Sequence, residues 1–320
     1  MSAAKSFLSM PVLKILLRTA ITLTILVLIV RAINLQQAWQ VMLHARLELL
    51  LVAVLSQFSS TWVSAYRWQL VMQNLNFGQS FIFYWRSYFK GMFFNQGLPT
   101  SIGGDAVRVL DVAACGFRKR DALYGIAVDR IAGLGALVLL TLVTHLFNPS
   151  LLPVQVYRIV VVLSALGCAG LASLWLFKRV FKRFPALGYY PQLAFIKVIS
   201  ERLAQAFAHH RLLLLFLSIL APIFAMLGFY ATGWALGLRY GLMAYFAIVP
   251  LALVLSVIPA SIAGWGVREG ALVGLFSLVG ADKTIVLMMS LLYGITLIIV
   301  SIPGVFVFLQ GRQHQGIEKD

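Results

Sequence analysis

Six long apolar segments constrain the fold of this chain more than any other feature. Each is about as long as the roughly 20 residues that an α-helix needs to cross the hydrocarbon core of a bilayer. Charged residues make up only 11% of the chain, against about 25% in an average soluble domain. The sequence predicts an all-α integral membrane protein with one membrane domain over residues 1–320. The predicted spanning helices cover about residues 12–33, 47–68, 121–147, 154–177, 212–237 and 283–309.

Two further apolar segments, about 81–116 and 242–280, are each interrupted by proline and glycine. The interruptions resemble one another: LPTSIGGDAVR covers residues 98–108 and IPASIAGWGVR covers residues 258–268. Pro, Ser, Ile, Gly, Val and Arg recur in the same register. Broken helices in paired positions are typical of transporters built from inverted repeats. We expect each segment to form a re-entrant helical hairpin. The alternative is that each segment crosses the membrane twice, and in both cases the segment enters and leaves on the same side.

The basic residues predict the orientation in the membrane. The segment 178–211 is rich in lysine and arginine, whereas 147–157 carries no charged residue. The positive-inside rule places the first segment and both termini on the cytoplasmic side of the cytoplasmic membrane. Repeat A (about 47–147) and repeat B (about 212–310) then have opposite orientations, and an amphipathic connector at about 178–211 lies along the cytoplasmic surface. The excess of 26 Lys and Arg over 10 Asp and Glu reflects this orientation, and we expect no binding to nucleic acid.

The interruptions also supply the candidate binding site. A helix that restarts after a break offers free backbone N–H groups, and glycine permits a ligand to approach closely, which suits an anion. An arginine one turn further along can bind a phosphate through two parallel hydrogen bonds. The substrate-binding residues predicted at these breaks are Ser101, Gly103, Gly104, Asp105, Arg108, Ser261, Gly264, Arg268 and Glu269. We interpret the carboxylates Asp105 and Glu269 either as partners of the arginines in the empty site or as proton acceptors that couple transport to a gradient.

Asp129 and Arg130 lie inside a predicted spanning helix, where a charged side chain costs about 2.5 to 3.5 kcal/mol or more. We interpret them either as an ion pair or as groups that couple transport to an ion gradient. Arg67 and Trp68 have the pattern of an aromatic anchor at the membrane interface. Neither cysteine nor histidine spacing suggests a metal site, and no motif of a catalytic or nucleotide-binding type is present. We therefore predict no catalytic residue, metal or cofactor.

The motifs GLP…GGDxxR (97–108), Asp129-Arg130 and P…GxGVRE (259–269) together resemble the lysylphosphatidylglycerol synthase transmembrane-region family, a group of flippase-like membrane proteins. The resemblance covers almost the whole chain and adds Asn95 to the predicted binding residues. It implies a standalone flippase unit without the aminoacyl transferase domain of the best-known members. Two positions depart from the family pattern: Thr100 replaces a glycine, and Gly294 stands where we expect an arginine.

These observations favour a lipid translocase that moves an anionic or phosphate-bearing lipid, such as a polyprenyl phosphate, between leaflets. The sequence leaves two alternatives open, a membrane-embedded transferase acting on a lipid phosphate and a non-catalytic membrane subunit of a lipid or cell-envelope pathway. We favour a transporter over an enzyme. Homo-oligomerisation and association with a lipid-modifying enzyme also remain open.

Overall fold

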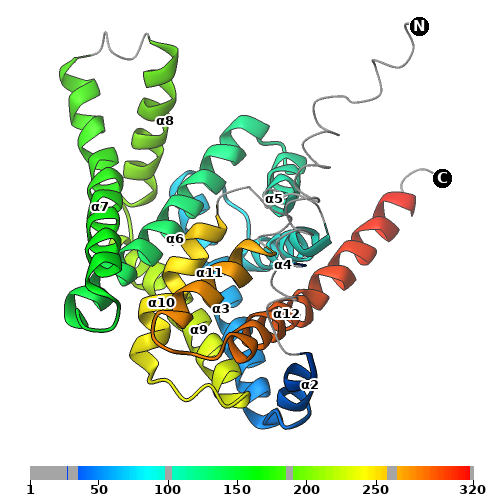
Figure 1. The fold of residues 1–320 in the computed structure, drawn as a ribbon. Coiled ribbons are helices and arrows are strands. Elements are labelled where there is room, and N and C mark those ends of the chain that lie inside the picture. Colours follow the sequence, from blue (N-terminus) through cyan, green and yellow to red (C-terminus); the bar gives the residue numbers. More distant parts are fainter. Residues whose placement is uncertain (1–26, 28–34, 98–102, 185–189, 258–264, 318–320) are drawn as a thin grey trace, which may run out of the picture.

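The computed structural model describes residue 27 and residues 35–97, 103–184, 190–257 and 265–317, and their regular structure is entirely α-helical (Figure 1). The predicted all-α membrane protein is thus confirmed. The helices are α2 (Leu35–Leu43), α3 (Leu47–Asn74), α4 (Phe81–Gly97), α5 (Gly103–Ala114), α6 (Lys119–Phe147), α7 (Val154–Arg183), α8 (Pro191–Ala206), α9 (Arg211–Ala235), α10 (Leu242–Ser256), α11 (Val267–Ser277) and α12 (Lys283–Ile317).

Within the described part of the chain, 5 helices are long and apolar enough to cross a membrane. They are α3, α6, α7, α9 and residues Lys283–Gln310 of α12. These helices match five of the six predicted spans, because each apolar run is bounded by polar or charged residues that end it. Almost all of the sixth predicted span, 12–33, lies outside the described residues.

The two interrupted segments form the helix pairs α4–α5 and α10–α11. The four helices have 17, 12, 15 and 11 residues, so at about 1.5 Å per residue each is shorter than the roughly 30 Å hydrocarbon core. Their lengths agree with the predicted hairpins. The connecting tips, 98–102 and 258–264, lie outside the described residues.

Helices α3 and α9 pack against each other along their lengths in opposite directions. Ser60 donates a hydrogen bond to the carbonyl of Ala221 at 2.8 Å, and Asn74 donates one to the carbonyl of His209 at 2.9 Å. The contacts among α3–α6 and α9–α12 also occur in matched pairs: α4 packs on α12 as α10 packs on α6, and α5 packs on α6 as α11 packs on α12. This is the pattern of two units related by a two-fold axis perpendicular to α3 and α9. An inverted repeat requires that arrangement. The boundaries of repeat A and repeat B stay a prediction.

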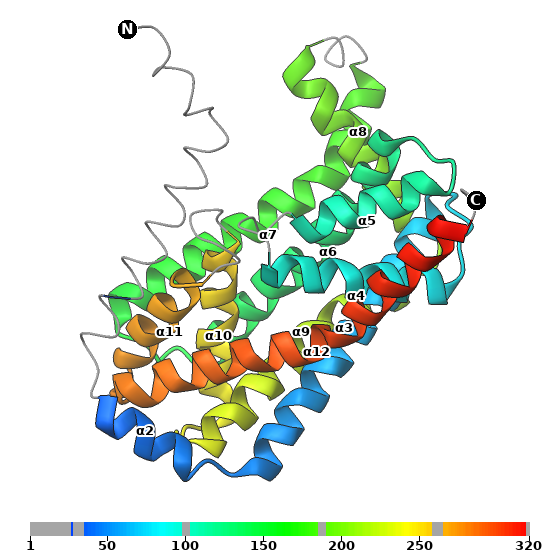
Figure 2. The ribbon, with the colours of Figure 1, turned by 90° about the vertical axis from the view of Figure 1, so that its right-hand side faces the viewer.

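Helices α7 and α8 lie outside this paired pattern and project from one side of the bundle (Figure 1). The predicted connector forms the end of α7 and a helix, α8, that folds back along it, and the hydroxyl of Ser200 donates to the carbonyl of Leu174 at 2.6 Å. The apolar face of α8, which includes Ile199 and Leu203, is buried. It packs on α6 and α7, and the position of the connector along the cytoplasmic surface stays a prediction. On the opposite side of the bundle α12 runs beside α3 and α4 (Figure 2).

Candidate functional site

Asp129 of α6 lies at the centre of a buried charged cluster. Its two carboxylate oxygens accept hydrogen bonds from Arg67 of α3 at 2.9 Å and from Arg108 of α5 at 3.0 Å. The guanidinium of Arg108 lies 3.9 Å from the ring centroid of Trp68 and 4.7 Å from that of Tyr88. All three charged side chains are almost inaccessible, with 6%, 2% and 5% exposure for Arg67, Asp129 and Arg108. Such charges remain ionised only because each one has a partner of opposite sign.

The cluster continues from Arg108 to a cavity. Arg108 donates to Asp105 at 3.1 Å, and Arg130 donates to both oxygens of Asp105 at 2.9 and 3.0 Å. Arg67, Asp129, Arg108, Asp105 and Arg130 therefore form one row of alternating charges, which we call the arginine–aspartate chain. Its three cations and two anions leave one uncompensated positive charge. The Arg130 side chain is 53% accessible, so this open end is where the charge can meet a ligand.

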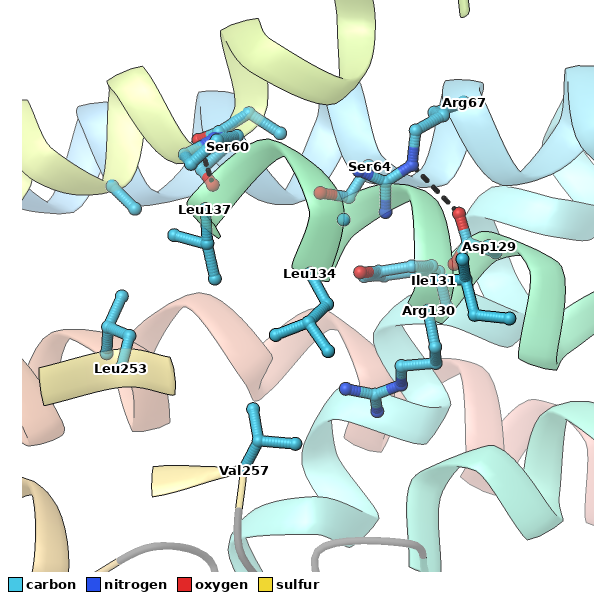
Figure 3. A pocket seen from close by; sticks show the side chains of 15 residues that line it. Ser60, Ser64, Arg67, Asp129, Arg130, Ile131, Leu134, Leu137, Leu253 and Val257 are labelled. Carbon is cyan, nitrogen blue, oxygen red and sulfur yellow. Dashed lines mark hydrogen bonds and ion pairs between the residues drawn. The ribbon is translucent and has the colours of Figure 1, made fainter. Parts of the chain in front are cut away.

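Two adjoining cavities meet at Arg130. A polar cavity of about 220 Å³ lies between α3, α4, α5 and α12, and a largely apolar cavity of about 320 Å³ lies between α3, α6, α9 and α10. Ser60, Ser64, Tyr88 and Arg130 line both. In Figure 3 the Arg130 side chain extends away from the Arg67–Asp129 pair, on the side of the cavity where Val257 lies. The combined space is polar at one end and apolar at the other.

A side chain of α4 binds a backbone N–H group at the start of α5. The Gly104 N–H donates to the side-chain oxygen of Asn95 at 2.7 Å. A Cβ atom at Gly104 would lie 2.0 Å from the carbonyl oxygen of Gly91. Gly104 therefore allows α4 and α5 to cross closely, and its amide is not free to bind an anion, contrary to the prediction from the glycine pattern. Gly103 is buried beside it at the first position of α5.

Arg268 of α11 belongs to a second, separate centre. It donates to Glu269 at 3.0 and 2.6 Å and to the hydroxyl and carbonyl of Ser290 at 3.1 Å each. The second carboxylate oxygen of Glu269 accepts from the Gly266 N–H at 2.6 Å. Arg268 and Glu269 are both buried. This centre is electrically neutral and internally hydrogen-bonded, and neither residue lines the two cavities at Arg130.

A comparison with protein-family models decides the identity of the chain. The model of the lysylphosphatidylglycerol synthase TM region matches residues 15–304. The chain belongs to this family. A search of curated proteins found no match.

Gly294 is the position at which this family member lacks the expected arginine. A Cβ atom there would lie 2.5 Å from the Trp265 ring and 2.8 Å from the guanidinium of Arg268. Trp265 and Arg268 thus fill the space that a side chain at 294 would need. A side chain at 294 would therefore require movement of Trp265 or Arg268.

The predicted site residues of this family member lie in different parts of the structure. Two predicted binding residues, Asp105 and Arg108, share the arginine–aspartate chain with Asp129 and Arg130, for which the sequence predicts an ion pair or a coupling role. Asn95 lines the polar cavity beside this chain. Arg268 and Glu269 form the second centre. Ser101, Ser261 and Gly264 lie outside the described residues.

The sequence interpretation of Arg67 and Trp68 as an interfacial anchor is wrong, because both side chains are buried against the chain of charges. The sequence of α3 contains a pattern that indicates this buried position. Ser60, Ser64 and Arg67 follow one another at spacings of four and three residues, which places them on one helix face. A polar stripe on an otherwise apolar spanning helix indicates a face turned toward a polar interior.

Proposed function

We propose that this protein moves a lipid with an anionic headgroup between the leaflets of the cytoplasmic membrane and that Arg130 binds the headgroup. The observation that carries the proposal is the open end of the arginine–aspartate chain, where one uncompensated positive charge faces a cavity. A positive charge inside a membrane protein is costly without enough counter-ions nearby. An anionic headgroup supplies that counter-ion.

The polar cavity supplies further partners for a headgroup. Gln57, Thr61, Asn95 and Gln96 line it together with Arg108. Amide and hydroxyl groups can donate to phosphate oxygens and accept from sugar or glycerol hydroxyls. Arg130 already binds the two carboxylate oxygens of Asp105 in a forked geometry, which is also the geometry in which a guanidinium binds phosphate. A phosphate could therefore replace Asp105 at Arg130 without leaving the arginine unpaired.

The apolar cavity suits the hydrocarbon part of the same molecule. Leu134 and Leu137 of α6 face it from one wall, and Leu253 and Val257 approach from the α10 side (Figure 3). Hydrocarbon chains need no hydrogen-bond partners, so an apolar wall next to a polar chamber matches the two ends of a lipid. The matched contacts of α3–α6 and α9–α12 support movement by rocking of two similar units about a shared site.

The proposal includes the orientation inferred from the basic loops, with both termini in the cytoplasm. Its partners are membrane lipids that carry an anionic headgroup or a polyprenyl phosphate. The direction of movement then depends on the lipid gradient or on the ion that drives it.

The test is a translocation assay in liposomes that contain the purified protein. A fluorescent phosphatidylglycerol and a polyprenyl-phosphate sugar are offered in turn, and their exposure to the opposite leaflet is measured by a membrane-impermeant quencher. Arg130→Gln should slow movement by roughly ten- to a hundredfold, because a hydrogen bond to a charged group contributes about 1.5 to 3 kcal/mol. Arg120→Gln is the matched control, since Arg120 lies on the same helix, is exposed and bonds Tyr124 outside the cavities.

Equal movement by the Arg130→Gln variant and the wild type would remove Arg130 from the site. Absence of movement for either lipid, with folded protein, would overturn the translocase proposal. Turnover of a lipid phosphate in the presence of a donor would then identify a membrane-embedded transferase, and absence of both activities would favour a non-catalytic subunit.

A further inference from the structure

A second apolar cavity lies between α6, α7, α8 and α9, away from the arginine–aspartate chain. Its volume is about 310 Å³, and its lining includes Ala136 of α6, Cys168 and Ala172 of α7 and Ile219 of α9. No residue of the arginine–aspartate chain lines it. The paired contacts that organise the two similar units leave this space open, because α7 and α8 have no counterpart in the pattern.

A basic cavity of about 620 Å³ adjoins the apolar one. Trp175 and Phe207 line both cavities, and their rings meet edge to face with centroids 5.6 Å apart. Arg179, Lys182 and Arg211 line the basic cavity, and its lining includes no carboxylate. Among the described residues, none of these three cations forms an ion pair. They are exposed and free to bind an external anion.

We propose that these two cavities form one binding site for an anionic phospholipid of the surrounding bilayer. The headgroup phosphate binds Arg179, Lys182 and Arg211, and one acyl chain passes Trp175 into the apolar cavity. The order of the groups matches that of a lipid in a leaflet: cations at headgroup level, an aromatic ring at the interface and an apolar space below it.

Charge complementarity selects an anionic lipid over a zwitterionic one. Each basic residue near a membrane surface strengthens binding to anionic lipid severalfold. A bound lipid would connect α7, which carries Arg179 and Lys182, to α9, which begins at Arg211. The lipid would thereby tie the projecting α7–α8 pair to a helix of the central bundle. This proposal concerns binding alone and does not require that the protein translocates lipid.

The test measures phosphatidylglycerol and phosphatidylcholine binding to the purified full-length protein by native mass spectrometry. A phosphatidylglycerol with a photoreactive acyl chain then maps the contact. Two variants separate the two parts of the site: a triple variant, Arg179→Gln, Lys182→Gln and Arg211→Gln, removes the cations, and Ala172→Trp fills the apolar cavity.

Each variant has a matched control. The triple variant Arg118→Gln, Lys119→Gln and Arg120→Gln removes the same charge from three exposed residues at the start of α6. Ala169→Trp places the same ring at an exposed position of α7 that does not line the cavity.

We expect the wild type to prefer phosphatidylglycerol, the first triple variant to lose roughly tenfold or more in affinity, and Ala172→Trp to lose severalfold. Both controls should bind as the wild type does, and cross-links should map to residues 168–175 or 215–219. Equal loss in the control triple variant would show a general charge effect and overturn the proposal. Unchanged binding in Ala172→Trp, or cross-links elsewhere, would overturn the acyl-chain part and with it the site.

Discussion

Replacement of Asp129 by asparagine is the sharpest test of the charged cluster. Among the described residues, Asp129 is the only carboxylate that pairs with Arg67, whereas Arg108 also pairs with Asp105. The Asp129→Asn substitution keeps the shape of the side chain and removes its charge. It therefore leaves Arg67, whose side chain is 6% exposed, without a counter-ion.

The expected loss follows from this difference between the two arginines. Removing one partner of a buried ion pair destabilises a protein by about 3 to 5 kcal/mol, because the remaining charge is left uncompensated. Arg108 keeps a carboxylate and should add little to the loss. Arg130→Gln is the comparison variant. Asp105 keeps its ion pair with Arg108, and the Arg130 side chain is 53% accessible, so this change should lower the free energy of unfolding by about 1 kcal/mol or less.

The free energy of unfolding can be measured by titrating the protein in mixed micelles with a denaturing detergent. The double variant Arg67→Met/Asp129→Asn removes both charges of one pair and should recover most of the stability lost in Asp129→Asn. The double-mutant cycle over Arg67 and Asp129 then gives their coupling energy.

Two results would refute the reasoning. One is an Asp129→Asn variant within about 1 kcal/mol of the wild type, which would mean that the charges are solvated or that Arg67 finds another partner. The other is a double variant no more stable than Asp129→Asn alone, since the loss would then not arise from an orphaned arginine.

Three further predictions rest on local contacts. Gly104→Ala should destabilise the protein by about 1 to 3 kcal/mol, because its Cβ would meet the carbonyl of Gly91; thermal unfolding checks this, and an unchanged midpoint would contradict it. Gly294→Arg should destabilise the protein by at least as much, and the double variant Gly294→Arg/Trp265→Ala should regain part of the lost stability because the smaller side chain opens space. Thermal unfolding checks this, and a double variant no more stable than Gly294→Arg alone would contradict it. Burial raises the pKa of the Asp282 carboxyl, but hydrogen bonds from Gln37 and from two backbone N–H groups at the start of α12 outweigh this and hold the pKa below its usual value. The contribution of Asp282 to the free energy of unfolding is therefore present above about pH 4 and is lost as the pH falls through the lower folded-state pKa. Asp282→Ala should cost about 1 kcal/mol at pH 7 and progressively less in acid. A difference in unfolding free energy that does not change with pH would contradict this.

The local sequence was enough to predict the membrane class, the position of five described spanning helices and the two interrupted helix pairs. Hydropathy over some twenty residues decides whether a helix can cross a bilayer. Glycine favours a break at the end of α4, which ends at Gly97, and before α11, where Gly266 precedes the first helical residue. The same local patterns drew attention to Asp105, Arg108, Asp129 and Arg130. Family membership also follows from motifs that can be read along the chain.

Only the tertiary structure decided which charged residues meet. Arg67 and Asp129 lie 62 positions apart on different helices, and their contact depends on how α3 packs against α6. The repeated motif suggested that Arg108 and Arg268 play equal parts, yet one lies in a chain open to a cavity and the other in a closed neutral pair. Local pattern determines the helices, whereas the partner of a buried charge depends on the packing of distant helices around it. That packing leaves one of two similar motifs open to a cavity and the other buried in an internally paired centre.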